Sequence, residues 1–285
     1  MTAETSPIPM ARRRSGRGRL VERGLIYLGA TLLALFVLVP IYMIAVSALT
    51  PRENAFDFPR SVIPAELSLD TILFFINATG VMDSFWRSVI VAIITLALSL
   101  AIGAPAGYAL ARYAFRGRDG YRLVVLSTRA FPIVILAIPL AVTYRIWGID
   151  DTVLGVALMH TALALPFTVL ITSSVFVSVP RELEEAAQTL GCNPLQAFLR
   201  VSLPLALPGL AAAAIFTWVL SWNDVFAAVI LTLREPTLPA KILSALTQSP
   251  IYFQFAAGFV MLVPSLVVIF FIRRYLLGLW GRVVK

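Results

Sequence analysis

Residues 88–111 read SVIVAIITLALSLAIGAPAGYALA, a run without a single charged side chain. At 1.5 Å per residue, a helix of this length crosses the hydrocarbon core of a bilayer, which is about 30 Å thick. Apolar runs in the buried helices of soluble proteins are usually no longer than about 14 residues, so a soluble core does not account for this run. The stretch therefore predicts a membrane-spanning helix.

Similar apolar windows occur at six places along the chain. They are residues 25–49, 88–111, 123–144, 152–176, 209–231 and 251–272. The composition agrees, because the 285 residues are 59% hydrophobic and only 13% charged, with a mean hydropathy of +0.89. Prolines inside the windows, such as Pro105 and Pro139, are tolerated in membranes because neighbouring groups satisfy the carbonyls that they free. The predicted fold class is an all-α membrane protein with six transmembrane helices.

The first window follows six arginines and resembles a signal peptide, but an apolar run of this length exceeds the 7–15 residues of a signal core. We expect an uncleaved first helix. Residues 1–20 are predicted to form a disordered basic cytoplasmic tail, and residues 21–285 a six-helix transmembrane domain. No internal repeat divides this domain.

The distribution of Lys and Arg predicts the orientation of these helices. Sixteen lie at the termini and in the segments 112–122 and 177–208, whereas six lie on the other side. Because basic residues are retained in the cytoplasm, both termini and the loop 177–208 are predicted to be cytoplasmic, and the loop 50–87 external. Arg129 falls within the third window, and we expect its side chain to reach the cytoplasmic edge without a role in transport.

Several classes of function are excluded by what the sequence lacks. The net charge of +8 arises from basic residues at the ends of apolar runs, which is not the pattern of a nucleic-acid-binding surface. The single Cys192 and the single His160 cannot build a His/Cys metal cluster, so no metal site is expected. The motifs H-E-x-x-H, G-x-S-x-G and G-x-x-x-x-G-K-[ST] are absent, so we expect neither an enzyme nor an ATP-binding chain.

The cytoplasmic loop carries the strongest functional signal. Residues 178–191 predict a short helix that begins near Pro180 and ends at Gly191, with acidic residues near its start. Asn193 and Pro194 predict the start of a second short helix, ending before Leu203 and Pro204. Two short helices joined by a glycine turn predict a compact cytoplasmic knob.

This loop resembles a known motif. Glu185-Ala186-Ala187, then three residues, Gly191, nine residues and Val201-Ser202-Leu203-Pro204 resemble the E-A-A loop of ATP-binding-cassette (ABC) importer permeases. Residues 107–118, 180–187 and 221–224 are similar to the carbohydrate-uptake branch of that family, in particular to the second permease of maltose-type systems. The C-terminal residues 279–285 depart from the usual small-residue tail of that branch.

The resemblance implies a type I ABC importer permease in the bacterial inner membrane. It also implies the partners: a second permease, two cytoplasmic ATPases, an external solute-binding protein and a sugar-type solute. ATP and Mg²⁺ would be bound by the ATPases, and this chain would need no cofactor. The residues that the resemblance assigns to ATPase coupling are Glu182, Glu185, Ala186, Ala187, Gly191, Leu203 and Pro204.

Four residues inside the predicted membrane region have two interpretations. Trp222, Asn223, Asp224 and His160 combine aromatic, amide and carboxylate groups, which commonly hold carbohydrates, so they are candidates for the substrate path. A polar group within the membrane also commonly bonds a neighbouring helix. The sequence favours that second role for the lone histidine and, by a small margin, for Asp224.

Other transporter and enzyme classes remain as alternatives. A secondary transporter could use Asp224 to bind a coupling ion, although it would be expected to contain an inverted repeat. A membrane enzyme would need a catalytic motif that the sequence lacks. An ABC permease for amino acids or peptides would share the E-A-A loop but not the matches at 107–118 and 221–224.

Overall fold

A computed structural model describes residues 16–56, 63–64, 66–246 and 249–280. The predicted tail 1–20 therefore lies mostly outside the described residues, and the part that is described, from Gly16, is helical. Within the described ranges, every regular element is a helix. The elements are α1 (Gly16–Ala48), η1 (Arg52–Phe56), α2 (Asp70–Ile76), α3 (Val81–Arg112), α4 (Arg118–Ser127), η2 (Thr128–Ala130), α5 (Ile133–Trp147), α6 (Val153–Ser178), α7 (Arg181–Thr189), α8 (Pro194–Ala197), η3 (Phe198–Ser202), α9 (Leu203–Asn223), α10 (Phe226–Leu231), α11 (Leu238–Leu246) and α12 (Ile251–Trp280).

Five of the six apolar windows form helices long enough to cross a membrane. These are α1, α3, α6, α12 and one continuous helix, Pro194–Asn223, that joins α8, η3 and α9. Helix α3 begins at Val81, so the last residues of the predicted external loop 50–87 belong to a spanning helix. The remainder of that loop contains the short elements η1 and α2.

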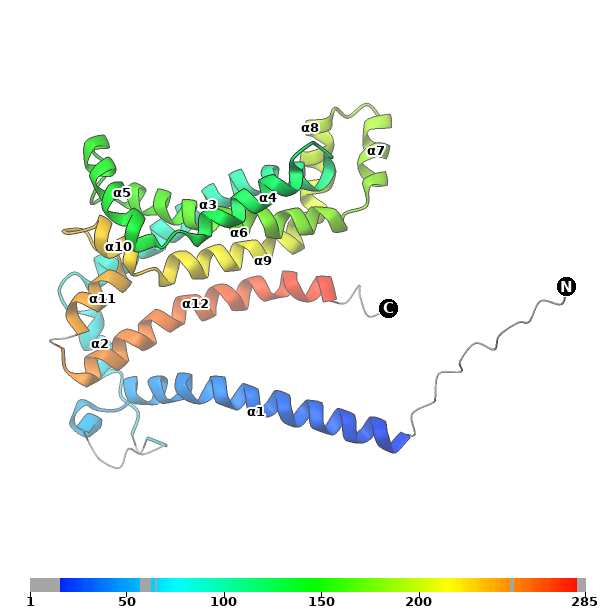
Figure 1. Ribbon diagram of the computed structural model, residues 1–285. Helices are drawn as coiled ribbons and strands as arrows, with labels where there is room; N and C mark the ends of the chain where they lie inside the picture. Colours follow the sequence, from blue (N-terminus) through cyan, green and yellow to red (C-terminus); the bar gives the residue numbers. More distant parts are fainter. Residues whose placement is uncertain (1–15, 57–62, 65, 247–248, 281–285) are drawn as a thin grey trace.

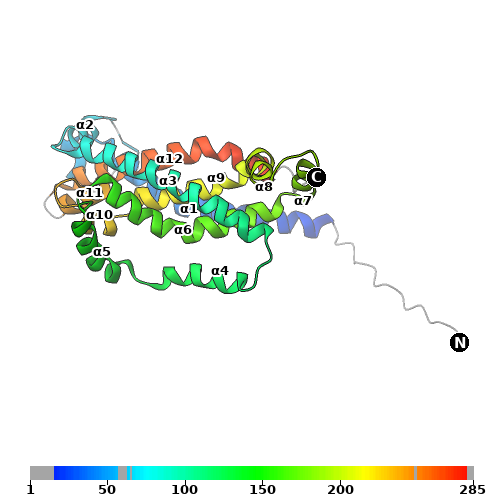
Figure 2. The ribbon, with the colours of Figure 1, turned by 90° about the horizontal axis from the view of Figure 1, so that it is seen from above.

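The third window, 123–144, differs from the expected single helix because it is broken in the middle. Pro132 precedes α5 and restricts the residue before it, so Phe131 adopts an extended backbone with φ −77° and ψ 119°. The segment still runs the length of the bundle. Figure 2 shows α4 running alongside α6, whereas α5 turns away from the long helices at the end of the bundle, where it packs on α10 (Figure 1).

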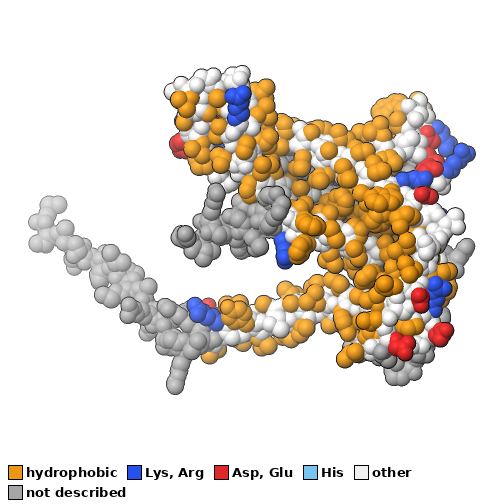
Figure 3. All heavy atoms as spheres, turned by 180° about the vertical axis from the view of Figure 1, so that it is seen from behind, with side chains coloured by type: hydrophobic (Ala, Val, Ile, Leu, Met, Phe, Trp, Pro, Cys, Tyr) orange, Lys and Arg blue, Asp and Glu red, His pale blue; other side chains and the backbone are white. Residues whose placement is uncertain are grey.

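The long helices lie side by side and all of the projecting elements lie at the two ends. Helix α3 packs most extensively on α6, α9 packs on both, and α12 lies between α9 and α1 (Figure 1). The start of α1, the end of α12 and the projecting α7 and α8 lie at one end, and α2, α10 and α11 lie at the other (Figure 1). Figure 3 shows hydrophobic side chains along the middle of the bundle and charged side chains gathered towards its ends, as expected for a membrane protein.

The seam between α3 and α6 is built from small and hydroxyl side chains. The Thr172 hydroxyl donates to the Gly103 carbonyl at 2.8 Å, and the Thr168 and Thr217 hydroxyls are hydrogen-bonded at 3.1 Å, which links α6 to α9. A Cβ atom at Gly107 would lie 2.1 Å from the Thr172 Oγ1 atom and 2.7 Å from the Ser173 backbone nitrogen. Gly103 and Gly107 form a G-x-x-x-G pair that allows this close approach.

We expect Gly107→Ala to destabilise the protein, because the added methyl would push the backbone of α6 away from α3. Overpacking of this kind costs about 1–3 kcal/mol. The measurement is the fraction of purified protein that stays monodisperse after heating in detergent, and the matched control is Gly29→Ala. Gly29 lies within α1 with no atom near its added Cβ. Equal heat resistance of the two variants would contradict this account of the seam.

Candidate functional site

The first short helix of the predicted knob, expected within residues 178–191, is present with defined ends. Helix α7 follows Pro180, carries Glu182 and Glu184 in its first turn, and has Leu190 at its C-terminal cap. Gly191 has φ +92°, and the Cys192 amide donates to the Ala187 carbonyl at 3.0 Å. The left-handed glycine closes the helix because other residues adopt this conformation only at a cost.

The second short helix begins as predicted but does not end as predicted. The Asn193 side chain accepts a hydrogen bond from the Gln196 amide at 2.8 Å, and the Gln196 side chain accepts one from the Asn193 amide at 3.0 Å. Instead of ending before Leu203 and Pro204, the chain passes through the π-helical turn η3 into α9. Pro204 has no amide hydrogen to continue an α-helical ladder, and a wider π turn before it keeps the backbone helical.

The knob, defined as residues 180–200, exposes a small apolar surface. Leu183, Leu190, Leu195 and Leu199 are 45%, 87%, 65% and 49% exposed. Figure 3 also shows hydrophobic side chains on the projecting part of the molecule. Apolar side chains that a single chain leaves open in this number commonly mark a surface for a protein partner.

The residues assigned to coupling have unequal positions in the structure. Glu182, Glu185, Ala186 and Gly191 are exposed on the knob and Ala187 is half-buried. Leu203 is half-buried and Pro204 is exposed, but both belong to the first turn of α9 rather than to the knob. The structure therefore brings together five of the seven residues on one projection.

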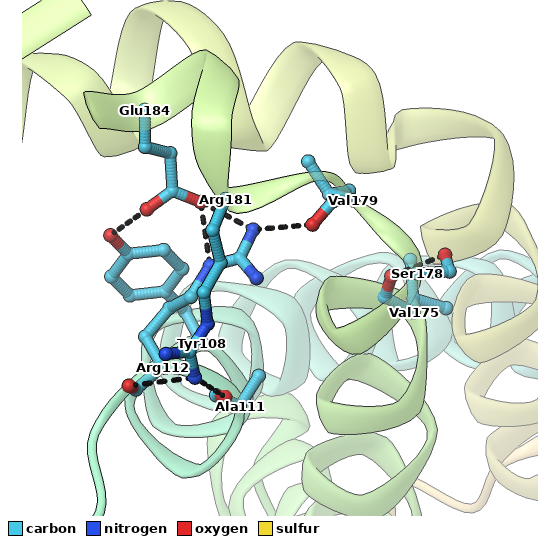
Figure 4. A network of polar contacts seen from close by, with 8 residues as sticks. All are labelled: Tyr108, Ala111, Arg112, Val175, Ser178, Val179, Arg181 and Glu184. Carbon is cyan, nitrogen blue, oxygen red and sulfur yellow. Dashed lines mark hydrogen bonds and ion pairs between the residues drawn. The ribbon is translucent and has the colours of Figure 1, made fainter. Parts of the chain in front are cut away.

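Glu184 is the acidic residue of α7 that turns inwards, and it joins the knob to α3. It is only 6% exposed. Its carboxylate accepts a hydrogen bond from the Tyr108 hydroxyl at 2.8 Å and from the Arg112 Nε atom at 2.6 Å, and it forms an ion pair with the Arg112 guanidinium (Figure 4). We call these three residues the clamp. All three point towards one another from α3 and α7.

Two backbone contacts complete the connection between the knob and α3. The Arg112 Nη2 atom donates to the Val179 carbonyl at 2.9 Å, just before α7 begins. In the opposite direction, Arg181 donates from its Nη2 atom to the Ala111 and Arg112 carbonyls at 3.2 and 3.1 Å (Figure 4). The end of α3 and the start of α7 are therefore held as one unit.

Electrostatics keep Glu184 ionised in spite of its burial. Burial favours the neutral acid, but hydrogen bonds from Tyr108 and Arg112 and the charge of Arg112 lower the pKa of Glu184 below its ordinary value of 4.5. The buried Ser202 hydroxyl also lowers the pKa of Glu184. Glu184 is therefore charged at neutral pH.

The sequence analysis did not identify the clamp. It counts Arg112 only among the basic residues that set the orientation, and it assigns no contact to Tyr108. Two features of the sequence bear on the clamp. Tyr108 and Arg112 are four residues apart and so share one face of α3. Glu184 is two residues from Glu182 and so lies on a different face of α7. Neither feature shows that the two faces meet.

The candidate residues for the substrate path form two groups in the structure. His160 is 1% exposed, and its Nδ1 and Nε2 atoms lie 2.9 Å from the Ser221 Oγ and 3.2 Å from the Asp224 Oδ2. Asp224 also accepts the Ala227 amide at 2.9 Å. These contacts join α6, the end of α9 and α10, which supports the helix-to-helix role for both residues.

Trp222 and Asn223 do not join this group. Trp222 is fully buried, donates from Nε1 to the Met261 carbonyl at 2.9 Å and stacks on Trp218 at 5.8 Å between ring centroids. Asn223 is exposed, and its amide donates to the Val219 carbonyl of its own helix at 2.9 Å. Of these two, only Asn223 presents a side chain outside the packed bundle. As for metals, no three ligand-type residues gather at one place in the described part of the chain.

Comparison with known protein families identifies the family of this chain. Residues 103–277 match the family described as the inner membrane component of binding-protein-dependent transport systems. The chain belongs to this family. Its members are permease components of ABC transporters and are not themselves catalytic, so the resemblance of the E-A-A loop is confirmed.

Individual relatives agree with this assignment. This permease is 31% identical over 262 residues to a trehalose transport system permease protein of Mycobacterium tuberculosis, covering 90% of this chain and 95% of that protein. It is 36% identical over 200 residues to a diacetylchitobiose uptake system permease protein of Streptomyces coelicolor, covering 68% and 66% of the two chains. These are permeases of sugar transport systems.

Solved structures confirm the fold class. A chain of a bacterial ABC transporter involved in the import of the acidic polysaccharide alginate matches with a TM-score of 0.71 at 21% identity, covering 93% of this permease and 100% of that chain. A chain of the MetNI methionine ABC transporter matches with a TM-score of 0.58 at 19% identity, covering 72% and 96%. The permease therefore has the ABC importer permease fold.

We expect Glu184→Gln to loosen the knob, because it leaves the buried Arg112 guanidinium without an ionic partner. Breaking a buried pair in this way costs about 3–5 kcal/mol. The measurement is hydrogen–deuterium exchange of the backbone amides of α7, which should become faster. The control is Glu185→Gln, one residue away and exposed, which should leave this exchange unchanged.

The pH dependence follows from the lowered pKa of Glu184. Because the folded value lies below 4.5, the contribution of the charged clamp is fully present above pH 4.5 and is lost as the pH falls through the folded pKa. Exchange in α7, corrected for its intrinsic rate, should rise below that pH in the wild type, with no such step in Glu184→Gln. An identical acid response in both proteins would show that another group controls the knob.

Proposed function

We propose that this permease, paired with a second permease, forms the path by which a carbohydrate is imported across the bacterial inner membrane. Two cytoplasmic ATPases would drive it and an external binding protein would deliver the solute. The clamped knob is the observation that carries this proposal. The sugar assignment is supported by the printed names of relatives, which include trehalose, diacetylchitobiose and alpha-glucoside transport systems.

The proposed mechanism is alternating access, and the knob has two rigid connections through which it can act. The clamp attaches α7 to the end of α3. The continuous helix Pro194–Asn223 attaches the other side of the knob to α9. A displacement of the knob by closing ATPases would therefore move α3 and α9 together, because packed elements shift as units rather than deform.

Energy and nucleotide binding belong to the partners in this proposal. ATP and Mg²⁺ would be held by the ATPase subunits, and this chain would supply the docking surface and half of the path. A secondary transporter is less well supported, because the Asp224 carboxylate is already engaged by His160 and by the Ala227 amide. The exposed Leu190 and Leu195 of the knob also have no role in such a transporter.

The coupling role of Glu185 and Gly191 can be tested separately from folding. Glu185→Lys reverses an exposed charge on the docking surface and should lower the affinity for the ATPase about tenfold or more. Gly191→Val forces a β-branched residue into φ +92° and should redirect α8, at a cost of about 1–2 kcal/mol. The measurements are retention of the ATPase on the purified permease and solute-stimulated ATP hydrolysis.

Two matched controls make this test specific. Asp119→Lys reverses another exposed charge, outside the knob, and Gly117→Val places the same side chain at φ +91° before α4. Neither control should release the ATPase. Normal ATPase retention and normal stimulated hydrolysis in both knob variants would refute the coupling assignment.

The proposed orientation places both termini and the knob in the cytoplasm. It is tested with an impermeant thiol reagent after the native Cys192 is replaced by Ser. The exposed Leu233 lies in the connection between α10 and α11, at the end of the bundle opposite the knob, and should react as Leu233→Cys in intact cells. The exposed Gln188 of α7 should react as Gln188→Cys only after lysis. The reverse pattern would invert the topology.

A further inference from the structure

Arg129 lies at the middle of the membrane-spanning bundle, not at its cytoplasmic edge. Its Nη1 atom donates to the Leu163 carbonyl at 2.9 Å, and its guanidinium lies over the ring of Phe167, 4.8 Å from the ring centroid.

 Leu163 and Phe167 flank the midpoint of α6, with Leu163 about 15 Å from one end of that helix and about 22 Å from the other. A side chain cannot bridge 22 Å, so the expectation that Arg129 reaches the cytoplasmic edge is wrong.

The backbone around Arg129 is broken at the same depth. Thr128, Arg129 and Ala130 form the single turn η2, Phe131 is extended, and all four side chains are exposed in this chain. Inside a bilayer, non-helical backbone is tolerated only where protein buries it or where it lines a water-filled cavity. The broken segment therefore cannot face lipid.

The charge of Arg129 leads to the same conclusion. In the described part of the chain, no carboxylate lies within ion-pair distance of its guanidinium, and its side chain is exposed. An unpaired arginine in the hydrocarbon core is costly, and charged residues at this depth nearly always face the bundle interior or a watery cavity. Water is the environment that best satisfies its remaining donors.

Aromatic rings lie directly beside this charge. The Phe167 ring of α6 packs on the Phe216 ring of α9, with 4.8 Å between their centroids, and the guanidinium of Arg129 lies over Phe167. An arginine has five N–H donors, and Leu163 occupies only one of those on Arg129. Phe167 therefore holds the guanidinium in place, and its free donors suit the oxygen atoms of a carbohydrate.

We propose that Arg129 and Phe167 form a subsite on the wall of the translocation path, halfway across the membrane, for an uncharged or anionic carbohydrate. The positive charge disfavours cationic solutes there, and the free guanidinium donors bind hydroxyl or carboxylate oxygens as the solute passes. This inference rests on the proposed function, because it names the solute class of the same path.

The test uses two small thiol reagents of opposite charge as probes, so the natural solute need not be known. Thr128→Cys is introduced beside Arg129 in a Cys192→Ser background, and the complex is purified with its second permease and ATPases. Reaction rates are measured with an anionic sulfonatoethyl and a cationic trimethylammonium-ethyl methanethiosulfonate. The same measurements are made after Arg129→Gln and after Arg129→Lys.

A wetted cysteine beside a positive charge should react faster with the anionic reagent. Arg129→Gln should lower the ratio of anionic to cationic rates about fivefold or more, whereas Arg129→Lys should retain it. Leu233→Cys serves as the reference for the intrinsic rates, because Leu233 is 79% exposed and lies in the connection between α10 and α11, at the end of the bundle opposite the knob. Its ratio should not change with either Arg129 variant.

Two results would overturn the assignment of Arg129. One is a cysteine at position 128 that neither reagent modifies in the assembled complex, which would show that the second permease or lipid covers this face. The other is an unchanged rate ratio after Arg129→Gln. A permease that purifies without an ATPase would contradict the proposed function instead, so the two failures are distinguishable.

Discussion

The hydrocarbon core of a bilayer cannot form hydrogen bonds, and this constraint determines where the polar groups of the permease lie. Each backbone amide and carbonyl in the membrane must be satisfied within the protein, which requires helices. The same constraint acts on side chains: Thr161, Thr168 and Thr172 of α6 donate to carbonyls one turn back along their own helix. The Thr172 hydroxyl also donates to the Gly103 carbonyl of α3. Hydrogen bonds that satisfy polar side chains inside the membrane therefore also hold neighbouring helices together.

Places where this constraint is not met within the chain indicate where other molecules or water must be. The knob exposes leucines that water does not favour, so a protein partner suits it. The break at Phe131 and the charge at Arg129 need water or protein instead of lipid. By contrast, His160 and Asp224 contact each other within this chain, as expected for groups that join helices. Unsatisfied groups therefore locate function here better than polarity alone does.

The sequence predicted those features that depend on neighbouring residues along the chain. Five of six windows became single long helices, and the two knob helices start where Pro180, Asn193 and Pro194 indicate, because length, capping and proline effects are local. The break in the third window was also locally encoded, by Pro132, but Pro105 within α3 causes no such break. Proline alone does not distinguish the two outcomes, because the outcome depends on the packing of neighbouring helices.

The inward turn of Glu184 and the depth of Arg129 could not be predicted, since both depend on how distant helices meet. The contacts between these helices also link the knob to the proposed subsite at Arg129. The clamp holds the knob to α3, the continuous helix holds it to α9, and both α3 and α9 pack on α6. Helix α6 carries Leu163 and Phe167, which hold Arg129. A movement of the knob therefore reaches the proposed subsite through a single shared helix, whose contacts on both sides are made by packed or hydrogen-bonded residues.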